Sequence, residues 1–583
     1  MSNDQPPYGP PQGWGQDPKQ GPQWGPPQQP GQQGWGSQGQ PQQGWGQQGQ
    51  GQPGWGPQGY GQQGYAQQGG PQGHYGPGDQ WSTAQQGPPP RRRKGLWIGG
   101  AAAATAVVLV GGGVFAFQQV LGGGGAQPAE AIPDTAVAYA RIDLDPSAGQ
   151  KINILRLLNR LPDFSEETGI DDEDADLRKV LFEQTLGKQD CDVDYEQDVE
   201  PWIGDRAGVA ALPGDGDEPT PLVVLQVTDR DAARDGVKAL AACDGSGDET
   251  GYDFVGDYLL VADSQRAASK AADDAEASPL SQDDTFSADM AELGEQGVAS
   301  AWGDLEGLAK IAGADADDLA LAKEQGLTSA ALALRAGSDY IEVASAARVT
   351  DAASADTDER SQVGQMPDDT VAAVGFAGGG KAVEQGWKAF EEALAGTPGF
   401  AADLDEIESG TGLSFPGDLV TLFGDNLTLA VGERGLDGLG NLQDPSGLRS
   451  LDVGLRSVTD ADELTSVIGN LNRLVGQAGV PELVTKESDD GLVVATNDDW
   501  AGKLAEGGSL GDTDAFTKVV PDGDDAVGVL YVDADKVSDV VGSVGGSDAA
   551  EAKKYLDPVR AIGFSVGAPD GDYTSGSLRV SFD

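Results

Sequence analysis

Histidine is the side chain most often used as a general base, and this chain of 583 residues contains only one, His74. His74 lies in a segment of Gln, Gly and Pro that cannot build a core. Serine–histidine–aspartate catalysis, cysteine–histidine catalysis and histidine-ligated zinc are therefore excluded for the folded part. The sequence also lacks a Gly-x-x-x-x-Gly-Lys-Ser/Thr phosphate loop. We accordingly assign no catalytic, cofactor-binding or metal-ligating residue and expect no cofactor.

Two cysteines, Cys191 and Cys243, are present. In an oxidising compartment outside the cytoplasm, two cysteines most simply form one disulfide. A bridge that closes this long loop would stabilise the fold by roughly 4 kcal/mol in the chain-entropy treatment. The sequence predicts a structural disulfide between Cys191 and Cys243.

Carboxylates are numerous enough to form an acid/base pair without histidine. Asp143 and Asp145 occupy the same face of a predicted strand and could act on glycans. Neither residue has an acidic counterpart at the corresponding position of the second half of the chain. A solvated strand face is therefore the favoured interpretation, and a carboxylate-dependent enzyme on envelope glycans is the alternative.

A calcium loop is the other chemistry that the carboxylates suggest. Asp172, Asp174, Asp176 and Glu183 have the 1, 3, 5, 12 spacing of such a loop. Position 6 is Leu177, where the sharp turn needs glycine. The segment also fits the acidic first turn of a helix, which the helix dipole stabilises. Weak binding of divalent cations is a further alternative.

Four tryptophans in the second part of the chain could stack on a sugar: Trp202, Trp302, Trp387 and Trp500. They are scattered along the sequence. Trp302 and Trp387 stand in apolar contexts typical of core elements, so packing is the favoured role for these two.

Strands and helices alternate after residue 131. Apolar alternation predicts a strand over 137–144, and apolar residues at helical spacing predict a helix over 151–161. Further patterns predict a strand over 221–227, a helix over 231–242 and a strand over 258–263. This order indicates an α+β fold.

The same order of elements returns about 230 residues later. Nine short motifs recur in register, for example Ile203-Gly204-Asp205 with Phe423-Gly424-Asp425, and Arg348-Val349 with Arg579-Val580. The repetition predicts a duplicated extracytoplasmic domain of two homologous α+β lobes, 131–350 and 366–583, joined by a linker over 351–365.

The first 94 residues are rich in Pro, Gln, Gly and Trp, with tryptophan about every ten residues from Trp14 to Trp55. Such a low-complexity segment cannot bury enough apolar area to offset chain entropy, so it is predicted to be a disordered cytoplasmic tail. An inert linker and a segment for weak multivalent contacts both fit this composition.

An uncharged run follows the basic cluster Arg91-Arg92-Arg93-Lys94. Its core of about 22 residues could cross a hydrocarbon layer of ~30 Å at 1.5 Å per residue. The sequence predicts one transmembrane helix over 96–120 and a Gly-rich spacer over 121–130. The basic cluster places the N-terminus in the cytoplasm and the C-terminal domain outside the cell membrane.

These features resemble a known family. A basic cluster, a Gly/Ala-rich span and the segments AIPDTAVAYARIDLDPSAGQKINILRLLNRLP and CDVDYEQDVEPWIGDRAGVAAL are similar to an actinobacterial domain-of-unknown-function family of single-pass membrane proteins. The resemblance implies an envelope location with no assigned activity, and it transfers no functional residue.

The net charge of −57 excludes nucleic acid as a partner, because the acidic domain repels phosphates and attracts cations and basic proteins. We predict a non-catalytic, membrane-anchored cell-envelope protein that binds or scaffolds an envelope protein or polymer whose identity is unknown. It would contact the lipid bilayer through its one helix, and self-association through the tail or helix is left open.

Overall fold

The computed structural model describes residues 121–122, 127–145, 148–165, 176–185, 193–214, 219–243, 250–311, 326–350, 359–394, 400–436, 445–477, 480–544 and 546–583. All of them belong to the second of two compact units of the chain, Lys94–Asp583.

The strands, in chain order, are β1 (Leu121–Gly122), β2 (Ala138–Asp145), β3 (Ile203–Leu212), β4 (Thr220–Val227), β5 (Gly251–Val255), β6 (Tyr258–Ala262), β7 (Ala299–Asp304), β8 (Leu327–Ala336), β9 (Tyr340–Val349), β10 (Thr370–Ala377), β11 (Asn426–Gly432), β12 (Val453–Val458), β13 (Val484–Glu487), β14 (Leu492–Ala495), β15 (Ala526–Asp533), β16 (Val559–Gly567) and β17 (Tyr573–Phe582).

The α-helices are α2 (Ala148–Leu158), α4 (Leu177–Thr185), α5 (Arg230–Cys243), α6 (Gln265–Ala277), α7 (Asp284–Leu293), α8 (Leu305–Ile311), α10 (Gly379–Leu394), α11 (Phe400–Thr411), α12 (Gly417–Phe423), α13 (Ala461–Gln477), α14 (Asp498–Glu506), α15 (Asp514–Val519), α16 (Ala534–Val544) and α17 (Ser547–Leu556). Short helical turns stand at Pro128–Ala131, Tyr195–Val199, Leu280–Gln282, Val363–Gln365, Pro445–Ser450 and Leu510–Asp512.

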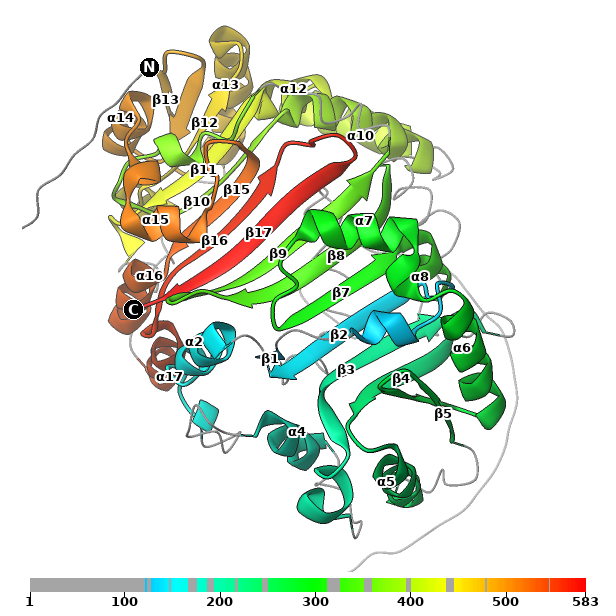
Figure 1. Ribbon diagram of the computed structural model, residues 1–583. Coiled ribbons are helices and arrows are strands. Elements are labelled where there is room, and N and C mark those ends of the chain that lie inside the picture. The colour runs from blue at the N-terminus through cyan, green and yellow to red at the C-terminus, as the bar shows by residue number, and fades with distance from the viewer. Residues whose placement is uncertain are drawn as a thin grey trace, which may run out of the picture. The chain divides into compact units, whose positions relative to one another are not determined.

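The described strands form one continuous sheet (Figure 1). From β2 to β17 all pairs are antiparallel, and the spatial order is β5-β6-β4-β3-β2-β7-β8-β9-β17-β16-β15-β10-β11-β12-β14-β13. The two-residue β1 pairs with β2 in parallel. The central pair joins β9 to β17 over nine residue positions, from Tyr573 opposite Arg348 to Ser581 opposite Tyr340.

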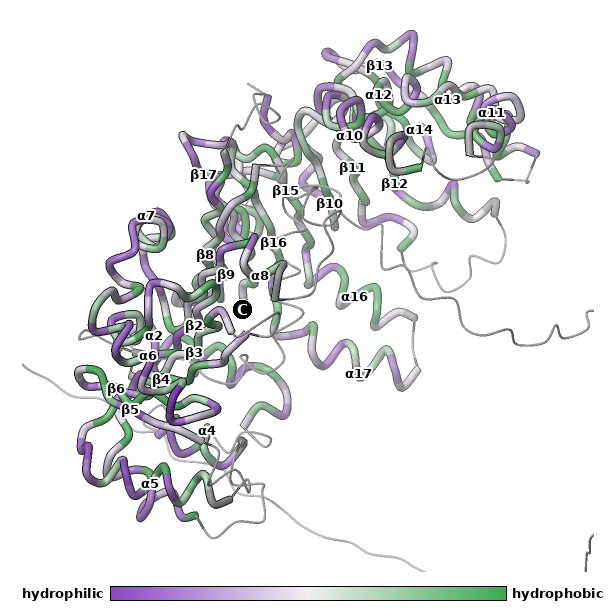
Figure 2. The backbone as a smooth tube through the Cα atoms, turned by 90° about the vertical axis from the view of Figure 1, so that its right-hand side faces the viewer, coloured by the Kyte–Doolittle hydropathy of each residue, from purple (hydrophilic) through white to green (hydrophobic). Residues whose placement is uncertain are grey.

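Helices cover both faces of this sheet. The face that carries Trp302 and Tyr531, here the first face, packs against α6 and α7 on one half and against α14 and α15 on the other. On the opposite, second face, α5 packs near one edge, α13 near the other, and α16 beside the centre. Figure 2 shows α7 and α16 on opposite sides of the strands.

Local sequence explains how the helices lie on the first face. In α6 four alanines at i, i+3, i+4 and i+7, from Ala268 to Ala275, are buried, and Ser264 caps the helix by accepting from the Ala267 N–H at 3.2 Å. Such small side chains allow the helix axis to lie close to the strands. The sequence predictions of β2, α2, β4, α5 and β6 are confirmed, with ends shifted by three residues or fewer.

The prediction of two lobes, 131–350 and 366–583, is wrong, because β9 and β17 join both halves in a single sheet. Corresponding glycines also differ in role. Gly204 lies within β3, whereas Gly424 follows α12 with φ of 54°, a conformation that favours glycine. The predicted linker 351–365 ends at the turn Val363–Gln365, which contacts β10 and β15.

The prediction of a transmembrane protein is also corrected. Within the described ranges, every helix is too short or too polar to cross a membrane. The finding does not support a helix anchor over 96–120, a single-pass topology or a cell-membrane location with a cytoplasmic N-terminus. Residues 1–94 and 96–120 themselves lie outside the described residues.

The structure shows no disulfide among its described residues, which corrects the prediction of a bridge between Cys191 and Cys243. Cys191 lies outside these residues. Of Cys243 only the backbone is described, at the last position of α5.

Candidate functional site

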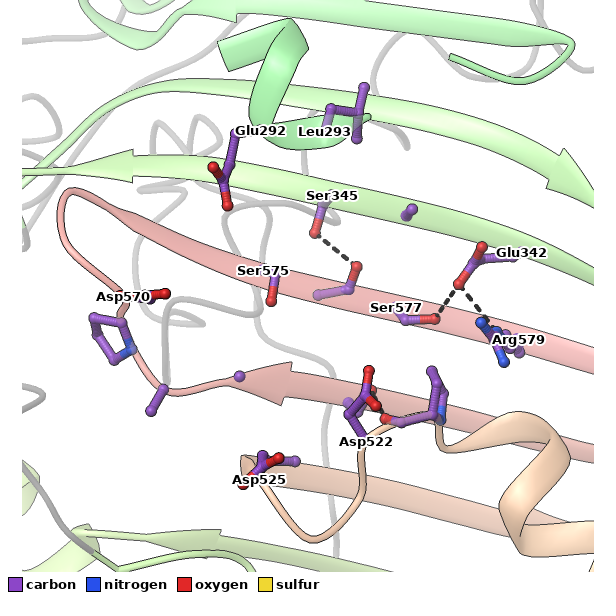
Figure 3. A pocket seen from close by; sticks show the side chains of 18 of the residues that line it. Glu292, Leu293, Glu342, Ser345, Asp522, Asp525, Asp570, Ser575, Ser577 and Arg579 are labelled. Atoms are coloured by element: carbon purple, nitrogen blue, oxygen red, sulfur yellow. Dashed lines mark hydrogen bonds and ion pairs between the residues drawn. The ribbon is translucent and has the colours of Figure 1, made fainter. Parts of the chain in front are cut away.

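A cleft of about 720 Å³ opens on the first face, where the helices of the two halves leave the central strands uncovered. Its floor is formed by β9, β17 and β16. One wall is the end of α7, and the other is the loop 520–525 between α15 and β15 (Figure 3). In Figure 1 the uncovered strands lie between α7 and α15.

The floor consists of small side chains in adjacent positions of three strands. Ala344 stands opposite Ser577, and Ser577 stands opposite Ser565. Ser575 lines the same floor. Because alternate residues of a strand point to one face, these side chains share the first face with the core residues Trp302 and Tyr531. A floor of alanine and serine lets a ligand approach the sheet closely.

Glu342 is buried in the cleft, and each of its two carboxylate oxygens has a partner. Glu342 Oε1 accepts from Ser577 Oγ at 2.7 Å and from Arg579 Nε at 3.0 Å, while Oε2 lies 3.6 Å from Arg335 Nη1. The Arg579 guanidinium also stacks on the Tyr340 ring, 4.5 Å from its centroid. The network therefore holds β8, β9 and β17 together and leaves Glu342 little capacity for proton transfer.

A second buried carboxylate fixes the α7 wall. Asp289 is 0% exposed and accepts from Trp302 Nε1 at 2.7 Å and Ser329 Oγ at 2.5 Å. Its other oxygen accepts from Arg348 Nε and from Tyr573 Oη, both at 2.9 Å. Burial and, as the second largest cause, the hydrogen bond to Asp289 raise the pKa of Tyr573 to about 12. The Tyr573 hydroxyl therefore stays protonated at neutral pH and can donate a hydrogen bond. Asp289 thus ties α7 to the β9–β17 pair.

Four exposed carboxylates surround the opening: Glu292 on α7, Asp522 and Asp525 in the loop 520–525, and Asp570 in the β16–β17 hairpin. Across the described ranges, none of these four carboxylates takes part in an ion pair or a hydrogen bond. The arginines of the floor, by contrast, are bonded to Glu342 or to backbone carbonyls such as Leu293 O. The described lining of the cleft holds five carboxylates against three arginines, so the cleft keeps a net negative formal charge.

No aromatic residue is found among the described residues that line the cleft. Aromatic side chains that stack on a sugar ring would favour the alternative of a glycan enzyme, and this described lining offers none. Within the described part of the chain, no group of three or more His, Cys, Asp or Glu is arranged to hold a metal ion.

The structure places Asp143 away from the cleft. It is 1% exposed on β2, and its Oδ2 accepts from Arg206 Nε at 2.7 Å and from Arg141 Nη1 at 3.3 Å. Burial raises the pKa of Asp143, and Arg206 and Arg141 oppose that shift. Asp145 ends β2, and its side chain is outside the described residues. The two residues do not form a described pair.

The other sequence candidates also lie apart. Three of the tryptophans, Trp202, Trp302 and Trp500, are each buried in a different hydrophobic cluster. Trp387 is half-buried on α10 and stacks on Phe415, with 5.9 Å between the ring centroids. Core packing is thus confirmed for Trp302, and Trp387 is less buried than predicted. Of the proposed calcium loop, Asp172 and Asp174 lie outside the described residues, and Asp176 accepts from Arg178 Nε at 3.0 Å.

A second cavity, of about 690 Å³, adjoins α14. Arg434 occupies it, donating from Nη2 to Asp452 Oδ1 at 2.8 Å and from Nη1 to Asp499 Oδ2 at 2.8 Å. These carboxylates raise the pKa of Arg434. Lys503 is paired with Asp369 in the same cavity. Three of the four carboxylates that line this cavity are paired with its two cations, so it offers a ligand fewer unbonded carboxylates than the cleft.

A family model described as "Protein of unknown function (DUF3352)" matches residues 99–437, which is more than half of the chain. The chain belongs to this family. No curated protein matches the chain. A solved structure titled "Structure of crystal form III of TP0453" aligns with 39% of this chain and 81% of that one, at 7% identity and a TM-score of 0.19. A likeness this weak carries no argument about fold or function.

The residues matched by the DUF3352 family model form only part of the cleft. The match includes α7 and β9, and hence Asp289 and Glu342, but ends before β16 and β17, which contribute Ser577 and Arg579. In the sequence, Arg348 and Arg579 stand out only as members of a repeated motif. Both are anchors of the cleft, and their position on neighbouring strands depends on a register that the sequence alone does not reveal.

Proposed function

We propose that this chain is a non-catalytic binding protein whose cleft holds a basic segment of a partner protein. The observation that carries the proposal is the ring of four unbonded carboxylates around a floor of small side chains. A lysine or arginine side chain entering the opening would meet free acceptors, and the flat floor would accommodate an extended backbone.

The rest of the chain supports the same class of partner. Its net charge of −57 raises the local concentration of cationic ligands and speeds their encounter. The one carboxylate buried in the cleft, Glu342, is held by Ser577 and two arginines, which favours a structural role over acid–base work.

An octalysine peptide labelled with a fluorophore is the probe for this cleft. Fluorescence anisotropy with the full chain should show binding that weakens as salt rises, because exposed charges are screened. The double variant D522N/D525N should lower the affinity about fivefold to thirtyfold, if each exposed pair contributes about 0.5–1 kcal/mol.

The matched control is D273N/E276Q, which removes two exposed carboxylates from α6, a helix outside the cleft. This control should retain the affinity of the unmodified chain. Equal losses in both double variants would show that the peptide responds to overall charge and would overturn the assignment to the cleft. So would an unchanged affinity in D522N/D525N.

A further inference from the structure

The second face of the sheet carries an apolar row that runs across six neighbouring strands. We call it the apolar strip, and each member stands directly opposite the next in the antiparallel registers: Leu429, Val374, Leu530, Phe564, Leu578 and Val343. Directly opposed side chains lie about 5 Å apart, so the six form one contiguous surface.

The apolar strip is open to solvent. Leu429 is 42% exposed and Leu578 is 38% exposed, and Leu530 and Val374 are exposed to a similar degree. Core residues of these same strands are below a tenth exposed, for example Tyr531 on β15. Large exposed aliphatic side chains gathered in one row are uncommon on soluble proteins and mark binding surfaces.

A neighbouring row extends the uncharged surface toward the other edge. It passes from Gly576 through Ser345, Leu332, Ala301 and Ala140 to Val209, which stands opposite Val223 on β4. Val209 is 52% exposed. Leu332 in the middle of this row is 7% exposed, so the row is covered there and the continuous open surface is the strip itself.

The length of the strip and the charge of the chain limit which ligands can occupy it. Six strands spaced by 4.7–4.9 Å span about 24 Å, and an acyl chain crosses one bilayer leaflet of about 15 Å. A full acyl chain can therefore lie along the strip. The net charge of −57 repels a second copy of the chain, a fatty-acid carboxylate and an anionic headgroup alike.

We propose that the apolar strip binds the acyl chain of a zwitterionic phospholipid. The strip lies on the face of the sheet opposite the cleft. Lipid binding there does not depend on the function proposed for the cleft. Apolar burial drives the binding, since each methylene removed from water contributes favourably.

The test uses the full chain and a phosphatidylcholine that carries a fluorophore on its headgroup, supplied below its aggregation concentration. The unmodified chain should bind it saturably, and L530Q/L578Q should weaken binding at least tenfold. The matched control is I407Q, because Ile407 is a 50% exposed aliphatic residue on α11, away from the strip. I407Q and D522N/D525N should bind as the unmodified chain does.

Circular dichroism and thermal midpoints would establish that L530Q/L578Q folds. Absence of saturable binding by the unmodified chain would overturn the proposal, as would equal weakening in I407Q. Sedimentation velocity would overturn it by showing a dimer that L530Q/L578Q dissociates, because a second copy would then cover the strip. Binding to intact phosphatidylcholine vesicles without uptake of single lipids would assign the strip to a bilayer surface instead.

Discussion

Replacing Asp289 by alanine should lower the free energy of unfolding by about 3–5 kcal/mol, because it leaves the Arg348 guanidinium without its carboxylate in a largely buried site. The Trp302 N–H, the Ser329 hydroxyl and the Tyr573 hydroxyl would lose the same acceptor. Each unsatisfied buried donor carries a further desolvation cost. Urea unfolding followed by tryptophan fluorescence measures the change.

The matched control for Asp289 is Asp284→Ala in the same helix. Asp284 is exposed in the first turn of α7, where a carboxylate stabilises the helix dipole by at most about 1 kcal/mol. A loss in Asp289→Ala no larger than in Asp284→Ala would contradict the role of Asp289 as the residue that ties α7 to the β9–β17 pair.

Replacing Trp500 by alanine should lower the free energy of unfolding by about 3–5 kcal/mol, the usual cost of emptying a large aromatic site. Trp500 is 0% exposed in the core beneath α14, and Gly432 has no space for a side chain because the indole ring lies against it. Among the described residues its Nε1 has no hydrogen-bond partner, so the loss comes from packing. Thermal and urea unfolding of the full chain measure it.

Trp387→Ala is the control of the same residue type. Trp387 is half-buried, donates from Nε1 to Glu391 at 3.0 Å and stacks on Phe415. Losing one such aromatic contact should cost about 0.5–1.5 kcal/mol. If both variants lost the same stability, Trp500 would not be the core residue that the structure indicates.

Single strands and helices are predictable from the sequence because the spacing of apolar residues is a local property. Alternation over residues 137–144 predicted β2, and helical spacing over 231–242 predicted α5, close to their observed bounds. The sequence predictions were wrong where a structure depends on which distant strands pair with one another. The motifs at Gly204 and Gly424 recur in the sequence, yet Gly204 lies in a strand and Gly424 ends a helix.

The sequence by itself determined which residue types are available for chemistry. From the single histidine at residue 74 and the net charge of −57, we expect neither histidine-based catalysis in the folded part nor binding of nucleic acid. The sequence also determined that strands and helices alternate after residue 131.

Only the tertiary structure decided where the binding surfaces are. Glu292, Glu342, Asp522 and Ser577 are separated by up to 285 positions in the chain and still line one cleft, because β9 pairs with β17. The apolar strip likewise exists only in the observed register. The side chain of a strand residue can point to either face of the sheet. A shift of the strand pairing by one position moves every side chain of that strand to the opposite face. The face is settled by pairing with strands far away in sequence, which no local pattern encodes.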